Sequence, residues 1–268
     1  MTEHSFLQAL ILGIVEGVSE FLPISSTGHL IVVGELIGFS SMPGKVFEVV
    51  IQLGAILAIC VLYRERLFRV VRDAPHDPSA RIFIGAILIA LVPAGLVGVL
   101  FHDFIISVLF SPYVVCSTLI LGGIAIIVIE RMHLEANITA IEKLPMRTAL
   151  KIGLFQCLAL VPGVSRSGAT ILGALLVGVE RKTAAEFSFF LAIPVMLGAS
   201  AINLLETWDL IQPSHAYMIA TGFTAAFISA LLVVQWLLNF VSNHGYTIFG
   251  WYRIVFGCLL LGFFLLRG

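Results

Sequence analysis

Charged residues are scarce in this sequence. Only 12% of its 268 residues are Asp, Glu, Lys or Arg, whereas a soluble globular domain carries about 25%. Hydrophobic residues make up 59% of the chain, and the mean hydropathy is +1.07. These values exclude a soluble domain and indicate an integral membrane protein. The formal net charge of −1 gives no basic surface, so no nucleic-acid partner is expected.

Cysteines are also few, and they lack the spacing of metal ligands or of a disulfide framework. Cys60, Cys116, Cys157 and Cys258 each lie in an apolar segment. We expect them to be small buried side chains without a metal or disulfide role. The first residues lack the basic region and the cleavage site of a secretory signal peptide, so no removable signal is expected.

Six apolar segments have the length of complete membrane spans. They are residues 46–63, 82–101, 113–130, 184–204, 216–239 and 247–266. Four further apolar segments are shorter and form two pairs, each interrupted at a proline. The pairs are 5–22 with 24–39, around Pro23, and 148–162 with 168–179, after Pro162. We predict that each pair is a re-entrant helical hairpin, which enters and leaves the membrane on the same side.

The order of one hairpin and three spans occurs twice. An odd number of spans places the second half upside down relative to the first, as in proteins whose broken helices meet at the membrane midplane. The sequence therefore predicts an all-α polytopic integral membrane protein with an inverted-topology repeat. It would form one membrane domain, 1–268, with the first repeat at 1–131 and the second at 132–268.

Lysine and arginine are concentrated in two connecting segments. Residues 64–81 hold five arginines, and residues 131–151 hold two arginines and two lysines, whereas 102–112 and 205–215 hold neither. The positive-inside rule places the two basic segments in the cytoplasm and both termini outside. The first hairpin would then enter from outside and the second from inside, so that their tips can meet within the protein.

Residues 16–29 gather acids, hydroxyls and a histidine between two apolar runs. Glu16 and Glu20 are four residues apart and share one helix face. Pro23 ends this helix, and the hydroxyl groups that follow can cap a second helix that begins near Gly28. The start of a helix presents free N–H groups to an anion. The other polar members of this motif are Ser25, Ser26, Thr27 and His29.

Residues 162–170 form the corresponding turn of the second half. Arg166 carries a planar fork that suits phosphate, and Gly163 and Gly168 permit a close approach of the backbone. The hydroxyl groups of the turn are those of Ser165, Ser167 and Thr170. The composition predicts a phosphate cradle that opens a helix.

Together the two tips contain the groups that hydrolysis of a phosphoanhydride requires: a hydroxyl nucleophile, a base, and a cation for the developing charge. Glu16 and Glu20 would also hold a divalent cation, Mg²⁺ or Ca²⁺, that bridges phosphate oxygens. A second interpretation is a transporter or flippase, because the same broken helices would bind an anion or a lipid phosphate without hydrolysing it.

Residues 16–29 and 162–170 resemble the two signature motifs of the undecaprenyl pyrophosphate phosphatase family, also called the bacitracin resistance protein family. Residues 47–54 and 186–189 resemble it as well. The resemblance covers nearly the whole chain. It implies a hydrolase of the bacterial cytoplasmic membrane that converts an isoprenoid lipid diphosphate to the monophosphate and depends on a divalent cation. It also implies recycling of the lipid carrier for peptidoglycan, and bacitracin resistance on overproduction.

Ser26 is the predicted nucleophile, with Glu20 or His29 as its base. Two alternatives remain open: His29 as the nucleophile, and direct attack by a water that Glu20 or the metal activates. Arg166 is expected to clamp the diphosphate and to stabilise charge in the transition state.

The first complete span adds two predicted supporting residues, Glu48 and Gln52, on one helix face. Entry of the first hairpin from outside predicts an active site that opens to the periplasm. The expected partners are the lipid diphosphate and the surrounding membrane lipid. The sequence leaves open whether the protein is a homodimer.

Overall fold

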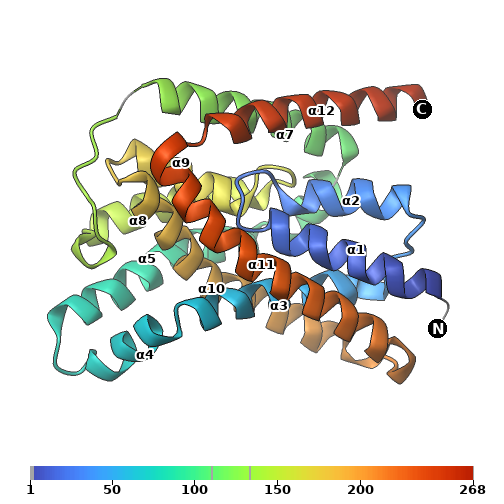
Figure 1. Ribbon diagram of the computed structural model, residues 1–268, viewed down its shortest axis with the longest axis horizontal. Coiled ribbons are helices and arrows are strands. Elements are labelled where there is room, and N and C mark those ends of the chain that lie inside the picture. Colours follow the sequence, from blue (N-terminus) through green and yellow to red (C-terminus); the bar gives the residue numbers. More distant parts are fainter. Residues whose placement is uncertain (1–2, 110, 133, 268) are drawn as a thin grey trace.

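The computed structural model describes residues 3–109, 111–132 and 134–267. It is an elongated bundle of helices with both chain ends at the same end of the molecule (Figure 1). Within the described ranges β-pairing is confined to one isolated parallel bridge, between Ile138 and Val179. The outermost residues of the two predicted repeats, 1, 2 and 268, lie outside the described residues.

The helices follow the order of the predicted segments. In the first half they are α1 (Glu3–Ser19), α2 (Ser26–Leu36), α3 (Val46–Leu62), α4 (Arg64–Asp73), α5 (Pro78–Leu100), the short α6 (His102–Phe104) and α7 (Pro112–Arg131). In the second half they are α8 (Met146–Gln156), α9 (Arg166–Leu176), α10 (Arg181–Thr207), α11 (Ala216–His244) and α12 (Thr247–Arg267).

Five of these helices, α5, α7, α10, α11 and α12, are long and apolar enough to cross a membrane. The helix α3 reaches that length only together with α4, and the two are bent by 70° at their junction. The protein is therefore a multi-pass helical membrane protein. Helices α1 and α2, and likewise α8 and α9, are short and are separated by breaks of the chain at residues 20–25 and 157–165.

The prediction of a loop at residues 64–81 was wrong for its first part, which is the helix α4. This helix is amphipathic: Leu67 packs against the buried core, while most of its charged side chains are exposed. Arg66 fixes it to the bundle by donating hydrogen bonds to Glu142 (2.5 Å) and Glu186 (3.0 Å). The segment is therefore helical despite its high charge, because its apolar residues recur with the period of a helix and Arg66 anchors it to the bundle.

Helices of one half pack against helices of the other. Helix α1 lies on α11, and α8 lies on α5; α7 pairs with α12, and α3 with α10. Glycines permit the closest of these approaches. A methyl group on Gly13 of α1 would collide with the backbone of Gly222 in α11, and one on Gly153 of α8 with the backbone of Ala90 in α5.

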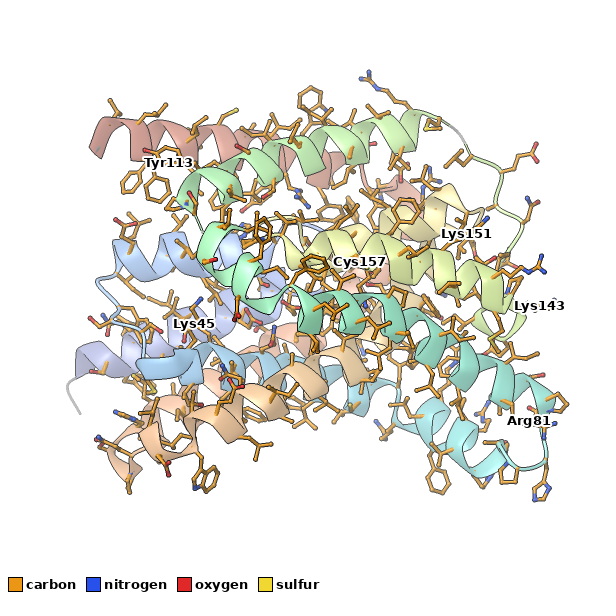
Figure 2. The ribbon with its side chains drawn as sticks, turned by 180° about the vertical axis from the view of Figure 1, so that it is seen from behind. Lys45, Arg81, Tyr113, Lys143, Lys151 and Cys157 are labelled. Atoms are coloured by element: carbon orange, nitrogen blue, oxygen red, sulfur yellow. The ribbon has the colours of Figure 1, made fainter. Side chains whose placement is uncertain are left out.

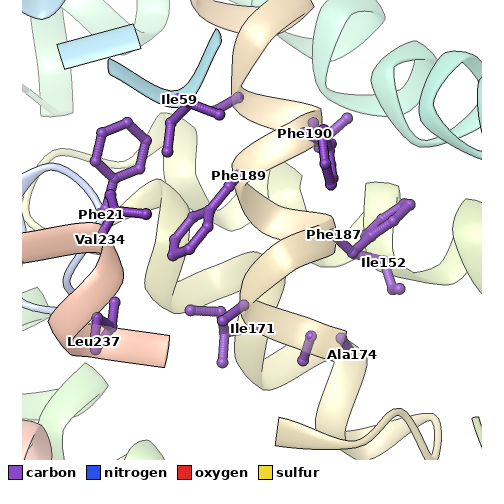
Figure 3. Packing of buried hydrophobic residues seen from close by; sticks show 14 of the residues in the cluster. Phe21, Ile59, Ile152, Ile171, Ala174, Phe187, Phe189, Phe190, Val234 and Leu237 are labelled. Carbon is purple, nitrogen blue, oxygen red and sulfur yellow. The ribbon is translucent and has the colours of Figure 1, made fainter. Parts of the chain in front are cut away.

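The break between α1 and α2 is anchored in the main hydrophobic core. Phe21 is completely buried and packs edge-on against Phe189 of α10, with ring centroids 5.4 Å apart (Figure 3). Ile171 of α9 and Val234 of α11 belong to the same cluster. Within a membrane such side chains stabilise the fold through close van der Waals packing rather than through removal from water. The core therefore holds the first break against α9 and α10.

Basic side chains gather at one end of the bundle. Arg81, Lys143 and Lys151 lie at the end opposite to Lys45 and Tyr113 (Figure 2). The chain termini lie at the Lys45 end (Figure 1). The basic segments and the termini are thus at opposite ends of the helices, as the positive-inside rule requires of the predicted orientation.

Candidate active site

The two breaks meet inside the bundle. We call residues 20–28 the first tip and residues 161–168 the second tip. The hydroxyl of Ser167 in the second tip donates a hydrogen bond of 2.8 Å to the carbonyl of Leu22 in the first. The structure therefore brings together the two segments that the sequence placed at one site.

The two tips share an unusual backbone feature. Ser25 precedes α2 with a φ of 71°, and Ser165 precedes α9 with a φ of 75°. Residues other than glycine rarely adopt this region, and such strain costs about 1–3 kcal/mol and is common at functional sites. Gly13 and Gly153 are separated by the same number of residues as these two serines. The correspondence between the two halves of the chain therefore extends back into the helices α1 and α8.

Ser26, Glu20 and Arg166 form one continuous row. The Ser26 hydroxyl donates a hydrogen bond of 2.5 Å to Oε2 of Glu20. The other carboxylate oxygen, Oε1, lies 3.5 Å from Nη2 of Arg166. Glu20 is only 6% exposed. A hydroxyl is thus paired directly with a carboxylate that can accept its proton, beside a fixed cation.

Arg166 lies between the Glu20 carboxylate and helix α10. Its Nη1 donates a hydrogen bond of 2.8 Å to the carbonyl of Ser188 in α10. Its Nε and Nη2 are buried and have no hydrogen-bond partner among the described residues. Nε therefore has no partner, and Nη2 has only the Glu20 carboxylate beside it at ion-pair distance. Buried donors without hydrogen bonds are costly, so an anion bound here would receive hydrogen bonds from both. Ser188 was not predicted as a site residue, although it lies in the segment 186–189 that resembles the family.

The hydroxyls of the second tip, and that of Thr170 in the following turn of α9, mostly make hydrogen bonds within the protein. Thr170 donates to the Arg166 carbonyl (2.9 Å) and shares a hydrogen bond of 2.7 Å with the Ser188 hydroxyl, so it braces the anchor of Arg166. Ser165 accepts a hydrogen bond from the Gly168 N–H (3.1 Å), which caps α9. Together with the hydrogen bond from Ser167 to the first tip, these contacts fix the shape of the turn that was predicted to cradle a phosphate.

Two glycines of the tips, Gly163 and Gly28, lie against helix α7. Gly163 has a φ of 89°, and a methyl group there would collide with the side chain of Thr118 in α7. Gly28, in the first turn of α2, is buried against Val115 and Leu119 of α7. Thr27, between Ser26 and Gly28, is exposed.

His29 lies close to Ser26 along the chain, but both of its ring nitrogens have other partners. Nδ1 is 2.7 Å from the Ser25 carbonyl, and Nε2 is 2.6 Å from the Tyr252 hydroxyl. The ring is stacked against those of Tyr252 and Phe256 on α12. Tyr252 was not predicted, because nothing in its apolar neighbourhood marks it as polar support for a residue far away in the sequence.

A cluster of carboxylates lies behind Glu20. Glu16 is 1% exposed, and its Oε2 has no hydrogen-bond partner among the described residues; Glu20, Glu48 and Arg166 are its electrostatic neighbours. Glu48 accepts a hydrogen bond of 2.6 Å from Ser41 through one oxygen, while its other oxygen is unpaired within the described chain.

The carboxylates fit a cation that arrives with a phosphate, but they do not form a closed cage. Within the described residues no group of three or more His, Cys, Asp or Glu side chains is arranged to hold a metal. Mg²⁺ is commonly bound by one or two carboxylates together with substrate phosphates and water. Glu16 and Glu20 supply that number. Gln52, the other supporting residue predicted on α3, lies one turn after Glu48 and is half-buried.

Comparison with known proteins gives a consistent result over the whole chain. The family described as Bacitracin resistance protein BacA matches residues 9–259. A protein of Parvibaculum lavamentivorans named undecaprenyl-diphosphatase is 76% identical over 264 residues, which are 98% of each chain. Undecaprenyl-diphosphatase 1 of Mesorhizobium japonicum is 51% identical over 96% of each chain. The protein belongs to the bacitracin resistance protein BacA family.

Proposed function

We propose that this protein hydrolyses undecaprenyl diphosphate to undecaprenyl phosphate and inorganic phosphate. This activity recycles the lipid carrier for peptidoglycan synthesis and confers resistance to bacitracin. Family membership and the names of relatives along nearly the full chain support it. The observation in the structure that carries it is the row of Ser26, Glu20 and Arg166, which joins the two tips.

The chemistry follows from this row. The Ser26 oxygen attacks the terminal phosphorus while its proton passes to Glu20. The bond between that phosphorus and the bridging oxygen breaks, and the lipid monophosphate leaves. Glu20 passes this proton to the departing oxygen of the monophosphate and is ionised again. It then takes a proton from the water that attacks the phosphoserine. The bond between phosphorus and the Ser26 oxygen breaks, inorganic phosphate leaves, and Glu20 returns the proton to the Ser26 oxygen. Arg166 donates through Nε and Nη2 to the phosphoryl oxygens, whose charge grows in the transition state.

The two helix starts contribute to binding. The N-termini of α2 and α9 both open at the tips, and each carries free N–H groups and the positive end of a helix dipole. The backbone at Ser25, Thr27 and Gly28 serves one end of the diphosphate, and that at Gly163 and Gly168 serves the other. The isoprenoid tail lies in the membrane lipid, where it adds affinity without much selectivity for length.

His29 has a supporting role in this mechanism, because its nitrogens are occupied by Ser25 and Tyr252. We expect His29→Ala to retain at least about tenfold more activity than Ser26→Ala, and Tyr252→Phe to stay within about tenfold of wild type. Steady-state phosphate release measures all three variants. An inactive His29→Ala beside an active Ser26→Ala would instead assign the nucleophile to His29.

Glu16 and Glu20 would hold a divalent cation, Mg²⁺ or Ca²⁺, and the cation would supply positive charge to the diphosphate. Removal of divalent cations by a chelator is expected to lower phosphate release by at least about 100-fold. Glu16→Gln should weaken cation binding about tenfold. Calorimetry with Ca²⁺ and a non-hydrolysable isoprenyl diphosphonate gives a readout that is independent of turnover. Full activity in excess chelator would contradict this role.

The finer topology is also part of the proposal. Exchanging α1 with α8, α3 with α10, α5 with α11 and α7 with α12 maps two of the observed helix contacts onto two others: α1 with α11 onto α8 with α5, and α3 with α11 onto α10 with α5. This correspondence supports inverted repeats at 1–131 and 132–268, with two re-entrant hairpins and six spans, α3 being the sixth. The basic segments at one end support a cytoplasmic-membrane protein whose site opens to the periplasm.

Phosphate release by the purified protein in detergent tests the proposed function against the transporter interpretation. A micelle has no second compartment, so transport alone releases no phosphate. Release from an isoprenyl diphosphate at many turnovers per protein is expected. Tight binding of the lipid diphosphate by a folded protein, without any release, would favour the transporter or flippase.

A further inference from the structure

Among the residues that the structure describes, Arg253 of α12 is the largest fully buried side chain, at 1% exposure. Its guanidinium donates five hydrogen bonds, all to backbone carbonyls. The acceptors are Pro23 (3.1 Å), Gly163 (3.1 Å), Val164 (2.8 Å), Thr118 (3.0 Å) and Leu119 (3.3 Å). The first belongs to the first tip, the next two to the second tip, and the last two to α7. A single side chain therefore joins four parts of the fold.

One atom of Arg253 connects the two tips directly. Nη1 donates both to the Pro23 carbonyl and to the Val164 carbonyl. Pro23 lies three residues before Ser26, and Val164 lies two residues before Arg166. The position of this nitrogen consequently sets the position of the predicted nucleophile relative to the predicted phosphate clamp.

The cost of burying Arg253 indicates a positional role. Among the described residues, no carboxylate forms an ion pair with it, so its charge is balanced by carbonyl dipoles alone. A buried charge without a counter-ion is expensive in an apolar interior, and an aliphatic residue would suit a membrane helix better. Arginine is the side chain with five N–H donors in a fixed fork; lysine has three, and glutamine has two.

The surroundings are shaped for the guanidinium. A methyl group on Gly122 of α7 would collide with Nη2 and Cζ of Arg253, and one on Gly168 would lie 3.1 Å from Nη1. Thr118 strengthens the same junction through its side chain, which donates a hydrogen bond of 2.7 Å to the Pro162 carbonyl. Helix α7 and the second tip thus leave space for this side chain.

We propose that Arg253 is a positioning residue for the hydrolysis: it holds the first tip against the second through their backbone carbonyls, so that Ser26 faces Arg166. The inference rests on the proposed phosphatase function. Arg253 does not touch the substrate in this mechanism. It acts through the alignment of the two residues that do.

The first test replaces Arg253 by lysine, which keeps the charge and removes two donors. Because a displacement of about 1 Å can cost about 100-fold in rate, we expect kcat for phosphate release to fall about 100-fold while KM changes less than about threefold. Arg181→Lys is the matched control. It weakens another interhelical arginine, which pairs with Glu130, and should leave kcat unchanged.

A second variant displaces the guanidinium without removing it. Gly122→Ala places a methyl group against Arg253 and should lower kcat in the same way. Gly95→Ala is its control, because a methyl group there meets nothing within 4 Å. In an Arg166→Lys background, Arg253→Lys should cost less than about threefold further, because there is no longer an aligned clamp to lose. If kcat of the double variant falls by the product of the two single effects, the positioning role would be overturned.

Hydrogen–deuterium exchange supplies a readout that does not depend on activity. Backbone amides of both tips should exchange faster in Arg253→Lys and Gly122→Ala, and at wild-type rates in Arg181→Lys and Gly95→Ala. Unchanged exchange and unchanged kcat, with an active wild type, would overturn the proposal for Arg253 alone. An inactive wild type whose tips still loosen in Arg253→Lys would overturn the phosphatase function and leave the structural link in place.

Discussion

Ser26→Ala is expected to lower kcat for phosphate release by at least about 10³-fold, with little change in KM. The alanine lacks the oxygen that attacks phosphorus, while Arg166 and both helix starts remain to bind the diphosphate. The Glu20 carboxylate loses one hydrogen bond but keeps its neighbour Arg166. Steady-state kinetics on an isoprenyl diphosphate, with thermal unfolding in detergent as a check of folding, measures the effect.

Ser19→Ala is the matched control for this substitution. Ser19 is also buried beside the first tip, but its hydroxyl donates only to the Val15 carbonyl of its own helix turn. Its removal should leave kcat within about twofold of wild type. Comparable activities of Ser26→Ala and Ser19→Ala would remove Ser26 from the mechanism and leave an attack by water as the remaining route.

Arg166→Lys is expected to lower kcat/KM by about 10³-fold, even though the charge is retained. A lysine carries its three donors on a single nitrogen, so it cannot hold the Ser188 carbonyl and also present the planar, two-nitrogen fork that a phosphoryl group receives from Arg166. Both kcat and KM should suffer, because the guanidinium contacts the diphosphate before and during the reaction. The measurement is phosphate release over a range of substrate concentrations.

Arg72→Lys serves as the control for the arginine substitution. Arg72 is exposed on α4 and pairs with the adjacent Asp73, so its replacement should have no measurable effect on turnover. An Arg166→Lys enzyme with wild-type kcat/KM would show that only the charge is required at this position. The bidentate geometry argued for Arg166 would then be wrong.

Much of the fold is already determined by short-range patterns. Apolar length predicts the spans, and the all-helical, polytopic prediction is confirmed, as is the family. Pro23 and Pro162 indicate where the two short helix pairs break. The bend between α3 and α4 was missed, because it depends on Arg66 reaching Glu142 and Glu186, which are distant in the sequence.

The candidate site was predictable to the extent that its polar residues are concentrated in two motifs. Ser26, Glu20 and Arg166 meet in the structure, and their chemical roles stay predictions. The supporting residues were not predictable in the same way. Ser188 acts through its backbone carbonyl, which any residue possesses, and Arg253 stands alone in an apolar helix, where its partners are carbonyls of segments far away in the sequence.

The most direct test of the account is to trap the phosphorylated intermediate. The purified protein is mixed with isoprenyl diphosphate labelled in its terminal phosphate and stopped within one turnover. One half is quenched in acid and the other in neutral detergent, which preserves an acid-labile adduct, and both are digested for mass spectrometry. The account predicts an acid-stable phosphoryl group on Ser26, absent from Ser26→Ala. A single turnover in which labelled phosphate is released with no covalent adduct at any rapid-quench time, or an acid-labile adduct on His29, would contradict it.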